Sequence, residues 1–133
     1  MKIKKFEDLS IWRLALKITK IIYDLTSQSK FSKDFSLRDQ IRRAVISVSS
    51  NIVEGFEKNN NNEFIRFLKI SKGSVGEVRN QLLIALTVGY ISQTQFDKTN
   101  QELEDLANQI GGFISYLEKC RSEGRFIKRK LKN

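Results

Sequence analysis

Two amphipathic segments on either side of an asparagine-rich break, residues 59–62, constrain the fold more than any other feature of the sequence. In both segments, apolar side chains recur at intervals of three and four residues, which places them on one face of an α-helix. These side chains are Leu37, Ile41, Ala44, Val45, Val48, Ile52 and Phe56 in the first segment, and Phe64, Phe67, Leu68, Val75, Val78, Leu82, Ala85 and Leu86 in the second. Because the connection is so short, we expect the two helices to lie antiparallel.

Two further helices flank this pair. The first is expected over about residues 7–27, and the last opens at Ser92, with Gln95 in the capping-box position. An apolar heptad runs along the last helix at Phe96, Leu103, Ile110 and Leu117. The chain contains no proline that would interrupt a helix. The sequence therefore predicts an all-α fold, an antiparallel up-down-up-down four-helix bundle over residues 6–120, followed by a basic C-terminal extension at 121–133.

Local features of the chain predict how the helices begin and pack. Ser36 is expected to cap the second long helix, because serine is a preferred N-cap residue. Phe31 and Phe35, in the preceding connection, are expected to plug the end of the bundle. Gly73 and Gly76 lie inside the third long helix, where each glycine costs roughly 1 kcal/mol relative to alanine. We therefore expect close packing at both glycines.

The first helix carries more apolar surface than one core requires. Besides a stripe that includes Trp12 and Ala15, it has a second stripe on another side. This second stripe is formed by Leu14, Ile18, Ile21 and Leu25. A helix that is apolar over so much of its circumference is either central in its own fold or shared with a neighbouring subunit. We favour the shared arrangement, which predicts a subunit interface at the second stripe.

The net charge of +9 is concentrated at the two ends of the chain. Residues 1–5 contain three lysines, and residues 121–133 contain six basic residues against one acidic residue. The remainder holds 15 basic and 14 acidic residues, so it is nearly neutral. The candidate nucleic-acid contacts are Arg42, Arg43, Arg125, Lys128, Arg129 and Lys130. Ion pairing or simple solvation of a helix face is an alternative role for Arg42 and Arg43. Phe126 is the lone aromatic residue in the extension, so the sequence does not indicate base-specific RNA reading.

The composition argues against catalysis. The chain has no histidine, which removes the usual general base and the commonest zinc ligand. Glu54, Glu63 and Glu77 could in principle form an all-carboxylate metal site, but glutamates on a helix surface are far commoner. Cys120 lies on the apolar seam of the last helix, where a small buried side chain is the favoured role. We therefore expect a protein that is not an enzyme, with no metal and no cofactor.

Cysteine content and the N-terminal region indicate the compartment. A single cysteine forms no internal disulfide, so nothing indicates an oxidising environment. Charged residues interrupt the region in which a signal peptide or membrane span would need a continuous apolar run. These residues are Arg13, Lys17, Lys20 and Asp24. We expect a cytoplasmic protein with no membrane association.

The central pattern resembles a known family. The string QIRRAVISVSSNIVEGF, followed by EFIRFLKISKGSVGE, is similar to the bacterial four-helix bundle family of proteins encoded in intervening sequences of 23S rRNA genes, over about residues 6–120. This chain has Ser32 and Ser49 at two positions where the family often has proline. The resemblance implies a homopentameric ring. It also implies a relation to accessory proteins of diversity-generating retroelements, which form basic rings that bind nucleic acid and a reverse transcriptase.

Three functions remain open at this point. The first is a non-enzymatic, rRNA-associated ring that binds RNA or DNA through the basic residues named above. The second is an adaptor or accessory subunit for a protein partner, for example a reverse transcriptase, with Asn51, Glu54 and Glu63 as contacts or merely as an internal polar cluster. The third, an enzyme, is the least favoured because the chain offers no pair of nucleophile and base.

Overall fold

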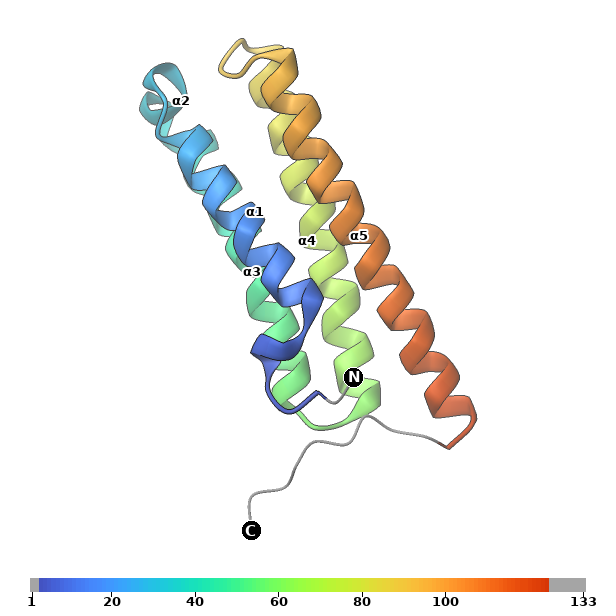
Figure 1. The fold of residues 1–133 in the computed structure, drawn as a ribbon. Coiled ribbons are helices and arrows are strands. Elements are labelled where there is room, and N and C mark those ends of the chain that lie inside the picture. The colour runs from blue at the N-terminus through green and yellow to red at the C-terminus, as the bar shows by residue number, and fades with distance from the viewer. Residues whose placement is uncertain (1–2, 125–133) are drawn as a thin grey trace.

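The computed structural model describes residues 3–124 and consists of helices and turns. Its elements are the 3₁₀-helix η1 (Phe6–Asp8) and the α-helices α1 (Ser10–Thr26), α2 (Ser29–Lys33), α3 (Phe35–Glu57), α4 (Asn61–Thr87) and α5 (Gln93–Ser122). The four long helices α1, α3, α4 and α5 alternate in direction along the chain (Figure 1). This confirms the predicted all-α helical bundle. None of the described helices is long and apolar enough to cross a membrane.

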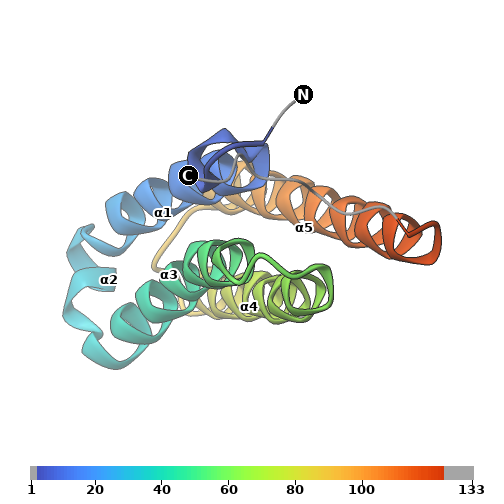
Figure 2. The same cartoon turned by 90° about the horizontal axis from the view of Figure 1, so that it is seen from below.

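The four long helices form two layers. Seen from one end, α3 and α4 lie side by side in one layer, and α1 and α5 lie over them (Figure 2). The pair α3–α4 has the most extensive contact, as its periodicity predicts. At Gly55, a Cβ would lie 2.7 Å from the Cβ of Phe67, so the missing side chain allows α4 to approach α3 closely. The core lies between the layers and includes the fully buried Leu68, Leu103 and Ile110.

The helix ends follow local capping rules, with one difference from the prediction. Ser92 accepts a hydrogen bond from the backbone N–H of Gln95 and completes the predicted capping box of α5. The prediction that Ser36 caps α3 is wrong, because Asp34 performs that role. Its Oδ1 accepts a hydrogen bond of 3.1 Å from the backbone N–H of Leu37. A carboxylate at this position also complements the positive end of the helix dipole.

The connection before α3 contains a short helix that the sequence reasoning did not predict. This helix, α2, turns Phe31 into the core, where the side chain is 0% exposed and its ring lies 5.4 Å from that of Tyr90. The prediction that Phe31 plugs the bundle end is confirmed. The same prediction is wrong for Phe35, which is 63% exposed. Phe35 is the first residue of α3 and lies on the outer side of that helix.

The structure also corrects the proposed interface on α1. Ile18 is 0% exposed and Leu25 is 6% exposed, so both belong to the core of the protomer and offer no surface to a neighbouring subunit. Leu14 and Ile21 are partly buried and pack against the same core. The buried face of α1 thus takes residues from both apolar stripes of the sequence. This accounts for most of the extra apolar surface from which the subunit interface was predicted.

Gly73 and Gly76 do not mark close packing within the protomer. A Cβ added at either glycine would meet no atom within 4 Å, and both residues are exposed on α4. The expectation of tight packing at these glycines is therefore wrong for the single chain. Tight packing against α4 occurs instead at Gly55 of α3.

Candidate nucleic-acid interface

Cationic and aromatic side chains gather where α1 ends, α2 crosses the bundle end and α3 begins. This surface, called the basic corner below, consists of Tyr23, Lys30, Lys33, Phe35, Arg38 and Arg42. Over residues 30–43 the chain carries five basic and two acidic residues. Lys30 and Lys33 are exposed, and within the described part of the chain they form no ion pair. Both ammonium groups are available to a phosphate.

Phe35 and Arg38 form the centre of this surface. The guanidinium of Arg38 lies 4.7 Å from the ring centroid of Phe35. Arg38 also donates a hydrogen bond of 3.0 Å to the carbonyl of Ser32 and pairs with Asp39 at 2.9 Å. These contacts fix the guanidinium against one side of an aromatic ring that is otherwise open to solvent. The signal in the sequence that could have identified this pair is the spacing of three residues between Phe35 and Arg38, which brings side chains together on one helix.

Arg42 ties α3 to α1. Its Nε donates a hydrogen bond of 2.8 Å to Thr26 Oγ1, and its Nη2 donates one of 3.2 Å to Ser27 Oγ. The guanidinium also lies over the ring of Tyr23, 4.5 Å from the centroid. Neither ion pairing nor simple solvation describes this residue. Its hydrogen bonds hold the inner edge of the basic corner in place.

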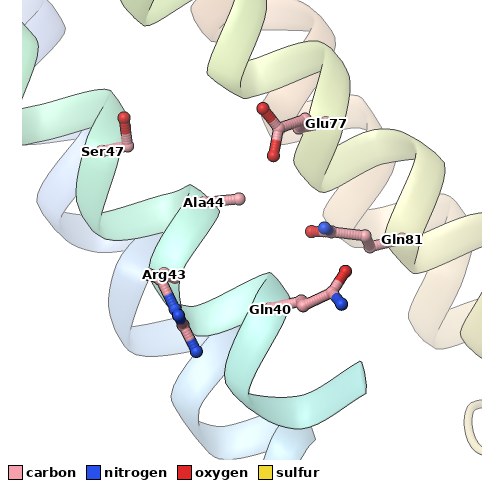
Figure 3. Close-up of a pocket in the computed structure, with 6 residues that line it drawn as sticks. All are labelled: Gln40, Arg43, Ala44, Ser47, Glu77 and Gln81. Carbon is pink, nitrogen blue, oxygen red and sulfur yellow. The ribbon is translucent and has the colours of Figure 1, made fainter. Parts of the chain in front are cut away.

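Arg43 lies on a different side of α3 from Arg42. Consecutive residues of an α-helix are about 100° apart around the axis. Arg43 is exposed and lines a groove that faces α4 (Figure 3). The structure therefore separates these two predicted contacts instead of joining them on one surface.

The other predicted contacts, Arg125, Lys128, Arg129 and Lys130, lie outside the described residues. Helix α5, which precedes them, ends at the opposite end of the bundle from the basic corner (Figure 1). Along α3, the 15 residues between Arg42 and Glu57 correspond to roughly 22 Å of helix. The extension thus begins far from the basic corner of the same protomer.

Asp34 keeps its negative charge beside the basic corner. This carboxylate accepts hydrogen bonds from the backbone N–H of Leu37 and from the hydroxyl of Tyr90. Both hydrogen bonds lower the pKa of Asp34 from the ordinary 3.8, and the one from Leu37 has the larger effect. The hydrogen bond that Tyr90 donates to Oδ2 of Asp34, at 2.9 Å, raises the pKa of Tyr90 above the ordinary 10.0. The charge of Asp34 is therefore used to cap α3 and to bind Tyr90, which joins α3 to the turn between α4 and α5.

The described residues contain no cluster of three or more His, Cys, Asp or Glu side chains that could hold a metal ion. Cys120 is 2% exposed, as expected for a buried side chain on the seam of α5. Of the polar residues considered as adaptor contacts, Asn51 donates to the carbonyl of Ser47, and Glu63 pairs with Arg66 at 2.8 Å.

Comparison with known proteins places the chain in a family. A family model described as the 23S rRNA-intervening sequence protein matches residues 7–112. The chain belongs to this family. A search of curated proteins found no match.

The crystal structure of another protein has a similar fold. It is a protein of unknown function from the S23 ribosomal protein family of Bacteroides thetaiotaomicron, determined at 1.70 Å. The match has a TM-score of 0.71 and 21% identity and covers 78% of this chain and 97% of that chain. This similarity supports the fold and carries no information about a ligand.

Proposed function

We propose that the protein is a non-enzymatic, homo-oligomeric nucleic-acid-binding protein, associated with rRNA, that contacts the phosphate backbone mainly through its basic residues. The observation that supports this proposal best is the basic corner, where free lysines flank a solvent-exposed aromatic ring. Family membership agrees with this function, although a family name based on gene position specifies no mechanism.

The basic corner has the components of single-strand binding. Lys30 and Lys33 supply ammonium groups for phosphates, and Phe35 presents a ring on which an unpaired base can stack. Arg38 already covers one side of that ring, which leaves the other side for the base. Among the six residues of the basic corner, no set of side chains is arranged to read base edges, so binding at this surface should depend weakly on sequence.

Self-association is the second part of the proposal. Leu14 and Ile21 are half-buried, so the larger apolar surface is on the outer side of α4. There Ile70 and Ile84 are 43% and 41% exposed and lie on one side of the helix, and Val88, which follows the last residue of α4, is 54% exposed. Burial of this side against another copy would repeat the basic corner and the basic extension around the assembly. The resemblance to the family gives the expected number of copies as five.

A salt titration tests the nucleic-acid part. Fluorescence anisotropy would measure binding of a 23S rRNA transcript, and of DNA with the same sequence, by the full chain and by a chain ending at Ser122. A double variant, Lys30→Gln with Lys33→Gln, should lower the slope of log Kd against log salt by about 1.4, because each phosphate contact on a single strand contributes about 0.7. A matched control replaces the exposed Lys69 and Lys98 by Gln and removes the same charge elsewhere.

The outcomes separate the contributions. A slope of log Kd against log salt that is smaller for the Lys30 and Lys33 double variant than for its control supports phosphate contacts at the basic corner. A loss of nucleic-acid affinity that is seen only in the shortened chain supports contacts from the extension. Failure of the full chain to bind either nucleic acid at low salt would overturn this proposal.

Solution mass distinguishes self-association from an adaptor role. The exposed apolar side of α4 could also receive a different protein, which is the specific observation in favour of the adaptor. Light scattering at micromolar concentration should show an oligomer for the full chain and smaller species for Ile84→Lys. A monomer in both cases would contradict self-association and favour the adaptor.

A further inference from the structure

Two aromatic rings of the basic corner, those of Tyr23 and Phe35, have the same surroundings. The guanidinium of Arg42 lies 4.5 Å from the ring centroid of Tyr23, and that of Arg38 lies 4.7 Å from the ring centroid of Phe35. Both rings are also open to solvent, because Tyr23 is 37% exposed and Phe35 is 63% exposed. The proposed function uses the ring of Phe35 for stacking, and the similar surroundings of Tyr23 indicate a similar use.

The two rings lie at separate positions on the basic corner. Phe35 begins α3, whereas Tyr23 lies near the end of α1, which runs beside the start of α3 (Figure 1). Their arginines are four residues apart on α3, which corresponds to roughly 6 Å along the helix axis. Within the described residues, the two rings make no contact with each other. They therefore form two distinct platforms.

Hydrogen bonds fix both arginines behind their rings. Arg38 donates to the carbonyl of Ser32 at 3.0 Å. Arg42 donates to the hydroxyls of Thr26 and Ser27 at 2.8 Å and 3.2 Å. Each guanidinium is thus held on one side of its ring, which leaves the other side for a planar ligand. Stacking on aromatic rings is the usual way in which proteins bind unpaired bases.

The carboxylates next to these groups in the sequence are engaged within the chain. Asp24 pairs with Lys20 at 3.0 Å, Asp39 pairs with Arg38 at 2.9 Å, and Asp34 caps α3. The two lysines of α2 form no ion pair within the described residues. Positive charge therefore remains beside the platforms for the phosphates of a strand.

We propose that Tyr23 is a second stacking platform, so that the basic corner binds two neighbouring unpaired bases, one on Phe35 and one on Tyr23. This inference rests on the proposed function and adds to it the form of the ligand, an unstacked single strand with at least two bases. A duplex fits less well, because its bases are already paired and lie against each other at about 3.4 Å. Bases on two separate rings instead lose their contact with each other.

Single-stranded DNA probes of equal length test the proposal with the full chain. All positions of a probe are abasic except for one adenine, or for two adenines that are adjacent or separated by one nucleotide. The number of phosphates is therefore constant. By fluorescence anisotropy at low salt, the better of the two-adenine probes should bind wild type about tenfold more tightly than the one-adenine probe, because each stacked base adds affinity.

Variants assign this gain to Tyr23. Tyr23→Leu should lose the gain from the second adenine, whereas Tyr23→Phe, which keeps the ring, should retain it. Tyr116→Leu is the matched control, because Tyr116 is 51% exposed on α5, outside the basic corner. The slope of log Kd against log salt should be the same for Tyr23→Leu and wild type, because the ring makes no phosphate contact. Circular dichroism would verify that the variants are folded.

Three results would overturn the proposal and leave the proposed function standing. The first is wild-type protein that binds the two-adenine probes no better than the one-adenine probe. The second is an equal loss for Tyr23→Leu on a probe without bases, which would show that Tyr23 acts only by positioning Arg42 for a phosphate. The third is a smaller solution mass for Tyr23→Leu in light scattering, which would place the ring in a contact between copies. Failure of wild type to bind any of the probes, or the 23S rRNA transcript, would instead overturn the proposed function itself.

Discussion

Replacement of Gly55 by alanine tests how α3 and α4 are held together. A Cβ at this position would lie 2.7 Å from Phe67 Cβ and 3.0 Å from Phe64 Cδ1. Alanine improves helix propensity by roughly 1 kcal/mol. The overlap opposes this gain, because Phe67 Cβ is fixed to the backbone of α4 and cannot rotate away. Overpacking of this kind typically costs about 1–3 kcal/mol, and so direct an overlap should lie near the upper end. We expect a net loss of about 1–2 kcal/mol in the free energy of unfolding.

Gly73→Ala provides a matched control in the neighbouring helix. A Cβ at Gly73 meets no atom within 4 Å, so the propensity gain should appear unopposed, at roughly 1 kcal/mol. Urea unfolding followed by circular dichroism gives both values, provided that the slope with denaturant is unchanged. The two variants should therefore change stability in opposite directions.

Two outcomes would refute this reasoning. One is a Gly55→Ala protein as stable as the wild type, which would mean that α3 and α4 separate without cost. The other is a Gly73→Ala protein that loses stability to the same extent at every protein concentration. A loss that grows with protein concentration would instead indicate that Gly73 lies in a contact between copies.

Three further substitutions test other parts of the structure. Tyr90→Phe removes the hydrogen bond to Asp34 and should lower the unfolding midpoint most between pH 3.8 and 10.0. The greater stability of the wild type should be lost as pH falls through the lowered pKa of Asp34 and as pH rises through the raised pKa of Tyr90. Thermal melts across this pH range would show both losses. Leu103→Ala, at a 0% exposed position, should cost about 2–5 kcal/mol in urea unfolding, whereas Leu83→Ala, at a 47% exposed position, should change stability by less than about 0.5 kcal/mol. Arg42→Ala should cost about 1 kcal/mol, because its hydrogen bonds to the hydroxyls of Thr26 and Ser27 at the end of α1 are partly exposed. No change in the unfolding midpoint would contradict the role of Arg42 in holding α3 to α1.

Much of the fold could be predicted from periodicity alone. The apolar heptad of α5 lies on the core, and Ser92 caps that helix with Gln95 as its spacing predicts. Such signals are local, because they depend on helix geometry and on hydrogen bonds within one turn. The structure adds which neighbour covers each face, and the sequence does not encode this locally. For this reason Ile18 was expected at an interface but lies in the core.

The candidate site was less predictable for the same reason. Phe35 was expected inside the bundle because it is aromatic, yet the unpredicted helix α2 buries Phe31 and leaves Phe35 outside. Arg42 was named from charge, but its partners are the hydroxyls of Thr26 and Ser27 at the end of α1, 16 and 15 residues earlier in the chain. Contacts of this range depend on how helices are placed, so charge and spacing could identify the residues but not their roles.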